Sequence, residues 1–168
     1  MADPGVRIEH PNRHKAASKL TRAIVVLLLL VSAFLVVVVT VGGWDVLQGA
    51  KALQIAYIAV YLVIAFFVLR WNRGVLPLAA ALAIVLLIFA AVSAPAWFDR
   101  DKPGFADPAI DEGILGLITA LLVPVQLLLI AFAMSGFRQA WNVEVERPVD
   151  EQPPPERPGR GDAAPAPV

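Results

Sequence analysis

Four long apolar segments constrain this chain more than any other feature, because none of them contains Asp, Glu, Lys, Arg or His. They are residues 23–43, 52–69, 75–94 and 113–134, with 21, 18, 20 and 22 residues. A helix needs about 20 residues to cross the roughly 30 Å of a hydrocarbon core. The segments are continuously apolar, without the alternation of a barrel strand. We therefore predict an all-α, polytopic membrane protein with four transmembrane helices in an up-down bundle.

The composition agrees with this class. Hydrophobic residues make up 58% of the chain and charged residues 17%, and the mean hydropathy is +0.70. Soluble domains have about 45–50% apolar and about 25% charged residues, so a water-soluble globule is excluded. The 14 basic residues balance the 14 acidic ones, which argues against a nucleic-acid partner. Because the chain has no Cys, disulfides and thiolate metal sites are excluded.

The distribution of Lys and Arg predicts the orientation. Eleven of these residues lie on one side of the predicted spans and three on the other. The eleven lie before the first span, between spans two and three, and after span four; the three are Lys51, Arg100 and Lys102. The first span is too long for the apolar region of a signal peptide, which has 7–15 residues, so we expect it to be retained. This predicts a multi-pass protein of the cell (inner) membrane with both termini in the cytoplasm.

The predicted spans divide the chain into three parts. Residues 1–22 are expected to form an unstructured, basic cytoplasmic tail, and residues 23–137 the four-helix transmembrane domain. Residues 138–168 are expected to form a disordered cytoplasmic tail, because seven of the last 22 residues are Pro. Each predicted span is followed by a Trp at an expected membrane interface, and these four interface anchors are Trp44, Trp71, Trp97 and Trp141.

The uncharged spans limit the chemistry that the chain can perform. An ionisable residue within the bilayer usually marks a proton relay, an ion pathway or a catalytic group. Without one, we expect no enzyme activity and no cofactor. Two weak metal signals lie outside the spans. His10 and His14 have helical spacing but no third ligand, and the acidic loop 95–112 has Pro103 and Ile110 at positions where a calcium loop needs oxygen ligands.

Small residues predict where the third and fourth spans pack, because they let two helix backbones approach closely. They form a stripe on each span: Ala79, Ala83, Ala90 and Ala94 on the third, and Gly113, Gly116 and Ala120 on the fourth. We expect these stripes to face each other, so that Cys residues introduced at Ala83 and Ala120 would cross-link.

A few neutral polar residues lie within the spans, namely Gln54, Tyr57, Tyr61, Thr119 and Gln126. Gln54, Tyr57 and Tyr61 share one face of the second span, and Gln126 lies near the middle of the fourth. They are expected to form hydrogen bonds between helices. The alternative is a shallow polar pocket that includes Gln126 or Thr119.

The sequence therefore predicts location better than activity. A non-catalytic accessory or scaffold subunit, embedded in the lipid bilayer and packed against other membrane subunits or a second copy, fits the missing chemistry. The alternative is a small oligomeric permease or channel for a neutral or weakly polar solute, lined by the polar residues of spans two and four.

Overall fold

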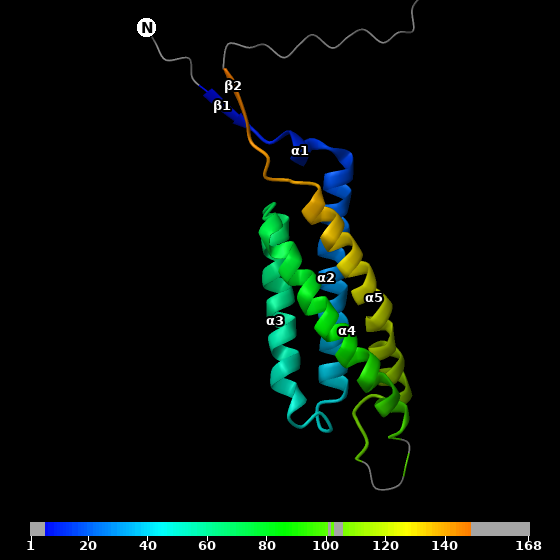
Figure 1. Ribbon diagram of the computed structural model, residues 1–168. Helices are drawn as coiled ribbons and strands as arrows, with labels where there is room; N and C mark the ends of the chain where they lie inside the picture. Colours follow the sequence, from blue (N-terminus) through cyan, green and yellow to red (C-terminus); the bar gives the residue numbers. More distant parts are fainter. Residues whose placement is uncertain (1–5, 101, 103–105, 149–168) are drawn as a thin grey trace, which may run out of the picture. The chain divides into compact units, whose positions relative to one another are not determined.

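The computed structural model describes residues 6–100, 102 and 106–148, and these residues are mostly helical (Figure 1). Four helices are long and apolar enough to cross a membrane: α2 (Ala16–Gly42), α3 (Ala50–Leu69), α4 (Leu76–Phe98) and α5 (Glu112–Arg138). A short 3-10 turn, η1 (Arg73–Val75), precedes α4. The prediction of a helical chain with four candidate membrane spans is confirmed.

The helices are longer than the apolar segments that predicted them. Helix α2 begins at Ala16, seven residues before the predicted span, and α5 ends at Arg138, four residues after it. Lys and Arg are good helix formers whose aliphatic stems can lie along apolar surface, so the charges of Lys19, Arg22 and Arg138 do not end a helix. Hydropathy marks only the part of each helix that lacks charge.

Short elements appear outside the four long helices, where the sequence predicts unstructured tails. Residues 6–22 contain strand β1 (Val6–Glu9), helix α1 (Pro11–His14) and the start of α2, and strand β2 (Val145–Pro148) follows α5. The strands pair antiparallel, from Val6 opposite Pro148 to Glu9 opposite Val145. Residues 149–168 of the predicted disordered tail lie outside the described residues. The strand pair and the helical unit, His10–Val143, are separate compact units.

Within the helical unit, α4 packs along α5, and α2 packs along both α3 and α5. By contrast, α3 and α4 contact each other little, although they are consecutive in the chain. The links from α2 to α3 and from α4 to α5 lie at one end of the unit, where the Ile110 N–H donates to the Gly42 carbonyl over 3.3 Å. Because α3 and α4 contact each other little, a cavity lies between them.

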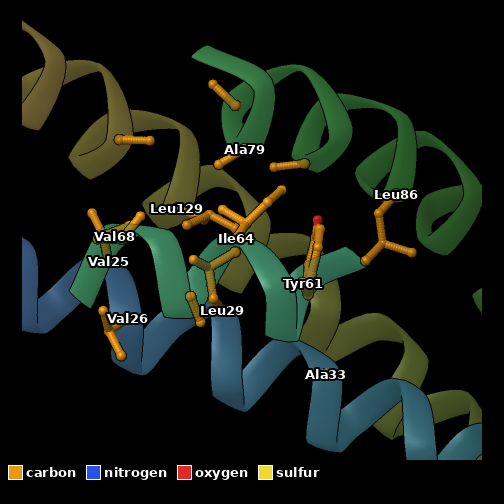
Figure 2. Close-up of a cluster of buried hydrophobic side chains, with 14 of the residues drawn as sticks. Val25, Val26, Leu29, Ala33, Tyr61, Ile64, Val68, Ala79, Leu86 and Leu129 are labelled. Carbon is orange, nitrogen blue, oxygen red and sulfur yellow. The ribbon is translucent and has the colours of Figure 1, made fainter. Parts of the chain in front are cut away.

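The core of the helical unit consists mainly of buried apolar side chains. Figure 2 shows Val25 and Leu29 of α2 facing Ile64 and Val68 of α3, with Leu129 of α5 beside them. All five are at most 2% exposed. Large apolar residues also cover the outside of all four long helices, for example Phe34, Val63, Val92 and Leu117. An apolar exterior around an apolar core is typical of helices surrounded by hydrocarbon.

Two glycine contacts give the register of α4 against α5. A Cβ on Gly136 would lie 3.2 Å from Leu76, and one on Gly116 would lie 2.8 Å from the Phe98 ring. The antiparallel helices therefore place Ala120 near the level of Ala94. Ala83 lies about ten residues from that level, or about 15 Å at 1.5 Å per residue. In this register Ala83 and Ala120 lie at different levels along the two helices, so the two stripes of small residues are offset.

Candidate functional site

A chain of neutral hydrogen bonds joins three helices inside the core. The Tyr61 hydroxyl of α3 donates to Gln126 Oε1 of α5 over 2.9 Å, and Gln126 Nε2 donates to Ser32 Oγ of α2, also over 2.9 Å. The Ser32 hydroxyl then donates to the Leu28 carbonyl over 2.7 Å. Gln126 and Ser32 are 0% exposed and Tyr61 1%. Each of these polar groups therefore has a protein hydrogen-bond partner in place of water, as buried polar groups generally do.

A second set of polar contacts lies nearer the end that carries the two links. The Thr40 hydroxyl of α2 lies 2.6 Å from both the Val36 carbonyl and Gln54 Oε1 of α3. The Tyr57 hydroxyl makes a long, 3.5 Å contact with the Leu82 carbonyl of α4, which is a weak hydrogen bond. Thr119 of α5 donates to the Leu115 carbonyl of its own helix over 2.7 Å. Of these contacts, only Thr40–Gln54 and Tyr57–Leu82 join one helix to another.

A cavity of about 260 Å³ opens beside this second set, in the space that α3 and α4 leave between them. Its inner wall contains Val39, Leu122 and Trp97, which are buried. On its outer side, Leu53 and Phe89 are 45% and 49% exposed, so the cavity opens sideways between α3 and α4. Polar side chains line only part of it: Gln54, Tyr57, Ser93, Thr119 and Arg100.

The cavity brings together some of the polar residues that the sequence singled out and separates others. Gln54, Tyr57 and Thr119 line it, whereas Tyr61 and Gln126 belong to the hydrogen-bond chain beyond its inner wall. Sequence reasoning missed Ser93, Trp97 and Arg100 as lining residues. Ser93 was visible as a polar residue near the end of a span. Nothing in the sequence placed Arg100 at a cavity, because that depends on where α4 ends.

The size and lining of the cavity limit what it could hold. Its volume is about 260 Å³ and most of its lining residues are apolar. A smaller engineered apolar cavity of about 150 Å³ binds benzene. The space therefore suits an apolar group the width of one ring or one hydrocarbon chain.

The small residues predicted to mediate packing lie at two depths. Ala79, Ala83, Ala90 and Ala94 are all buried on α4, the helix that packs along α5. On α5, Gly116 is buried, whereas Gly113 and Ala120 are partly exposed. Gly116 lies against the Phe98 ring, where any larger side chain would need the ring to move.

The four Trp residues lie in different environments. Trp44 is 45% exposed and Trp71 partly exposed, but Trp97 is 6% exposed and Trp141 is fully buried. Trp97 and Trp141 therefore contact mainly protein, where the sequence predicts interface anchors. Trp141 meets Trp71 edge to face, with 5.5 Å between ring centroids. Arg22 lies 4.0 Å from the Trp71 ring centroid and donates to the Leu69 carbonyl over 3.2 Å.

This Trp cluster depends on how α3 and α5 end. Trp71 has φ 63 and Ala140 has φ 49, so each chain segment turns through the left-handed region just after a helix. These turns lie next to the two Trp residues, Trp71 and Trp141, whose rings meet. The Trp141 indole N–H donates to Gln139 Oε1, and Gln139 Nε2 donates to Thr21 Oγ1 of α2 over 2.8 Å.

In the described part of the chain, no three His, Cys, Asp or Glu side chains gather closely enough to hold a metal ion. No family model, curated protein or solved structure matches the chain.

Proposed function

We propose that this chain is a non-catalytic accessory or scaffold subunit of the cell inner membrane, packed within a larger membrane assembly. Helices α2 to α5 would cross the bilayer in alternate directions as an up-down bundle, with both termini in the cytoplasm. The excess of Lys and Arg on the side of the termini supports this orientation. An enzyme reporter that is active only outside the cytoplasm should therefore be inactive when fused after Val168, and activity there would contradict the orientation.

The observation that carries the accessory role is the exposed apolar surface of α3. In the most apolar stretch of this helix 28% of the residues are buried, compared with 33% in α4 and in α5 and 50% in α2. Its exposed residues include Ile55, Val60, Leu62, Val63, Phe66 and Phe67. Phe66 and Phe67 contact each other edge to face at 5.8 Å on this surface. Aromatic side chains dominate many interfaces, so this face is suited to another helix as well as to lipid.

Extraction in a mild detergent followed by mass measurement tests the role. We expect the protein to come out with different subunits in unequal copies. Replacing Phe66 and Phe67 with Leu should weaken that assembly, whereas replacing Val92 on the exposed face of α4 should not. A chain that remains alone under conditions that preserve other membrane complexes would overturn the proposal.

The cavity favours one alternative, a small oligomeric permease for a neutral or weakly polar solute. Gln54, Tyr57, Ser93 and Thr119 would offer neutral hydrogen-bonding groups to such a solute. Against a path through one copy, Tyr61, Leu29 and Leu129 fill the core beyond the cavity. Transport would therefore need a path between copies. Solute flux into liposomes that contain only this protein, together with a symmetric oligomer, would support the permease over the accessory role.

A further inference from the structure

We propose that the cavity between α3 and α4 binds one acyl chain whose anionic head group lies at Arg100. The ligand class is a long-chain carboxylate or an anionic phospholipid, which share this chemistry. The site is separate from the exposed face of α3 on which the accessory role depends.

The shape of the cavity fits a single chain. Its inner wall is closed by Val39, Leu122 and Trp97, and its volume is about 260 Å³. That is below the range of about 300–1,000 Å³ usual for drug-sized ligands. The sideways opening past Leu53 and Phe89 faces the surroundings of the bundle, from which a hydrocarbon chain could enter without crossing water.

The polarity of the lining changes along the bundle. Tyr57 and Leu86 are buried, and Leu86 lies about three turns before the end of α4; the surfaces of both side chains are largely hydrocarbon. Gln54 and Ser93 lie nearer the end, and Arg100 lies just past the last residue of α4, Phe98. An apolar interior with a cation at one end of the lining matches an amphiphile with an anionic head.

Arg100 contacts a buried aromatic residue of the same lining. Its guanidinium lies 5.5 Å from the ring centroid of Trp97, which is itself a buried lining residue. A guanidinium on an aromatic face keeps its N–H groups at the edge of the plane, where they can meet carboxylate or phosphate oxygens. The position and chemistry of Arg100 therefore select a negative head group.

Native mass spectrometry of the purified full chain in maltoside micelles tests the site. The probes are palmitate, hexadecanol, a phosphatidylglycerol and a phosphatidylcholine. We expect one palmitate or one phosphatidylglycerol per chain, and at least tenfold weaker binding of hexadecanol and phosphatidylcholine. Palmitate alone would identify a free fatty acid as the ligand, and phosphatidylglycerol alone a membrane lipid; either result supports the proposal.

Neighbouring substitutions on α4 locate the binding. Ser93→Phe should fill the cavity and weaken binding at least tenfold, whereas Val92→Phe, at a residue that is 72% exposed and outside the lining, should leave it unchanged. Arg100→Gln should weaken palmitate binding about tenfold, the effect of one lost charge-assisted hydrogen bond, without changing hexadecanol binding. Lys102→Gln, at another cation of the same link that is not a lining residue, is the matched control.

Three results would overturn the proposal. They are absence of binding by both anionic probes, equal binding of hexadecanol and palmitate, and binding that Ser93→Phe and Val92→Phe weaken equally. If Ser93→Phe fails to fold, the comparison of Arg100→Gln with Lys102→Gln still decides the matter, because both positions lie outside the packed helices.

Discussion

Removing the Tyr61 hydroxyl tests whether the buried hydrogen-bond chain holds the helices together. Tyr61→Phe leaves Gln126 Oε1 without the donor that now lies 2.9 Å away, in a site with no access to water. Hydrogen bonds between membrane helices contribute about 0.6 kcal/mol on average and at most about 1.7. An acceptor left unpaired in a core costs about 1–3 kcal/mol. We therefore expect Tyr61→Phe to lower the free energy of unfolding by about 1–2 kcal/mol.

A double-mutant cycle separates this bond from the packing of the ring. Gln126→Leu also removes the bond to Ser32, so alone it should cost more than Tyr61→Phe. Both single variants lose the bond between Tyr61 and Gln126, whereas the double variant loses it only once. The two single losses should therefore sum to more than the loss in the double variant, and this difference, the coupling energy, should be about 0.6–1.7 kcal/mol. The assay is reversible unfolding of the purified chain in bicelles by titration with a denaturing detergent.

Tyr57→Phe is the matched control, since its hydroxyl makes only a 3.5 Å contact with the Leu82 carbonyl. It should cost less than about 0.5 kcal/mol. Additive effects of Tyr61→Phe and Gln126→Leu, within the usual error of about 0.3–0.5 kcal/mol, would refute the reasoning. So would an equal loss of stability in Tyr57→Phe.

Three further predictions follow from the packing. Gly136→Ala should destabilise the protein by about 1–3 kcal/mol, because its Cβ would lie 3.0 Å from the fully buried Trp141 ring, whereas Gly49→Ala meets nothing within 4 Å and should be neutral in the same unfolding assay. Cys residues at Ala94 and Ala120 should cross-link with a short reagent in this naturally Cys-free chain, and a pair at Ala83 and Ala120 should not; the reverse pattern on a gel would show that the α4–α5 register is wrong. Arg22→Gln should cost about 1 kcal/mol through loss of its contacts with Trp71 and the Leu69 carbonyl, while Lys19→Gln, at an exposed position, should have no effect.

Hydropathy was enough to predict the four long helices, because each is defined by a property that adds up over about 20 neighbouring residues. It placed the last residue of α3, Leu69, correctly but missed the first seven residues of α2. Charged residues such as Lys19 can continue a helix after the apolar run has stopped. The strand pair was missed for a different reason, since Val6 and Pro148 are far apart in the chain and neither segment has a periodic pattern.

The sequence predicted some residues of the candidate site but not how they are arranged. The sequence singled out Gln54, Tyr57, Tyr61, Thr119 and Gln126 as polar residues in apolar spans, but helix periodicity does not say which neighbour each one meets. In the structure Tyr61 and Gln126 lie in the core, whereas Gln54, Tyr57 and Thr119 line the cavity. The reason is that α3 packs along α2 but contacts α4 little. That divergence depends on the tertiary arrangement of the helices, which no local pattern encodes.

The pairing of β1 with β2 has a consequence for membrane insertion. Backbone hydrogen bonds between residues 6–9 and 145–148 can form only if both strands are in the same aqueous compartment, since no ladder can form across a bilayer. The chain between them must then traverse the membrane an even number of times. This parity does not depend on Lys and Arg at all. Because β2 is synthesised after α5, the ladder can close only once every preceding helix has been threaded, so its formation would report that insertion is complete.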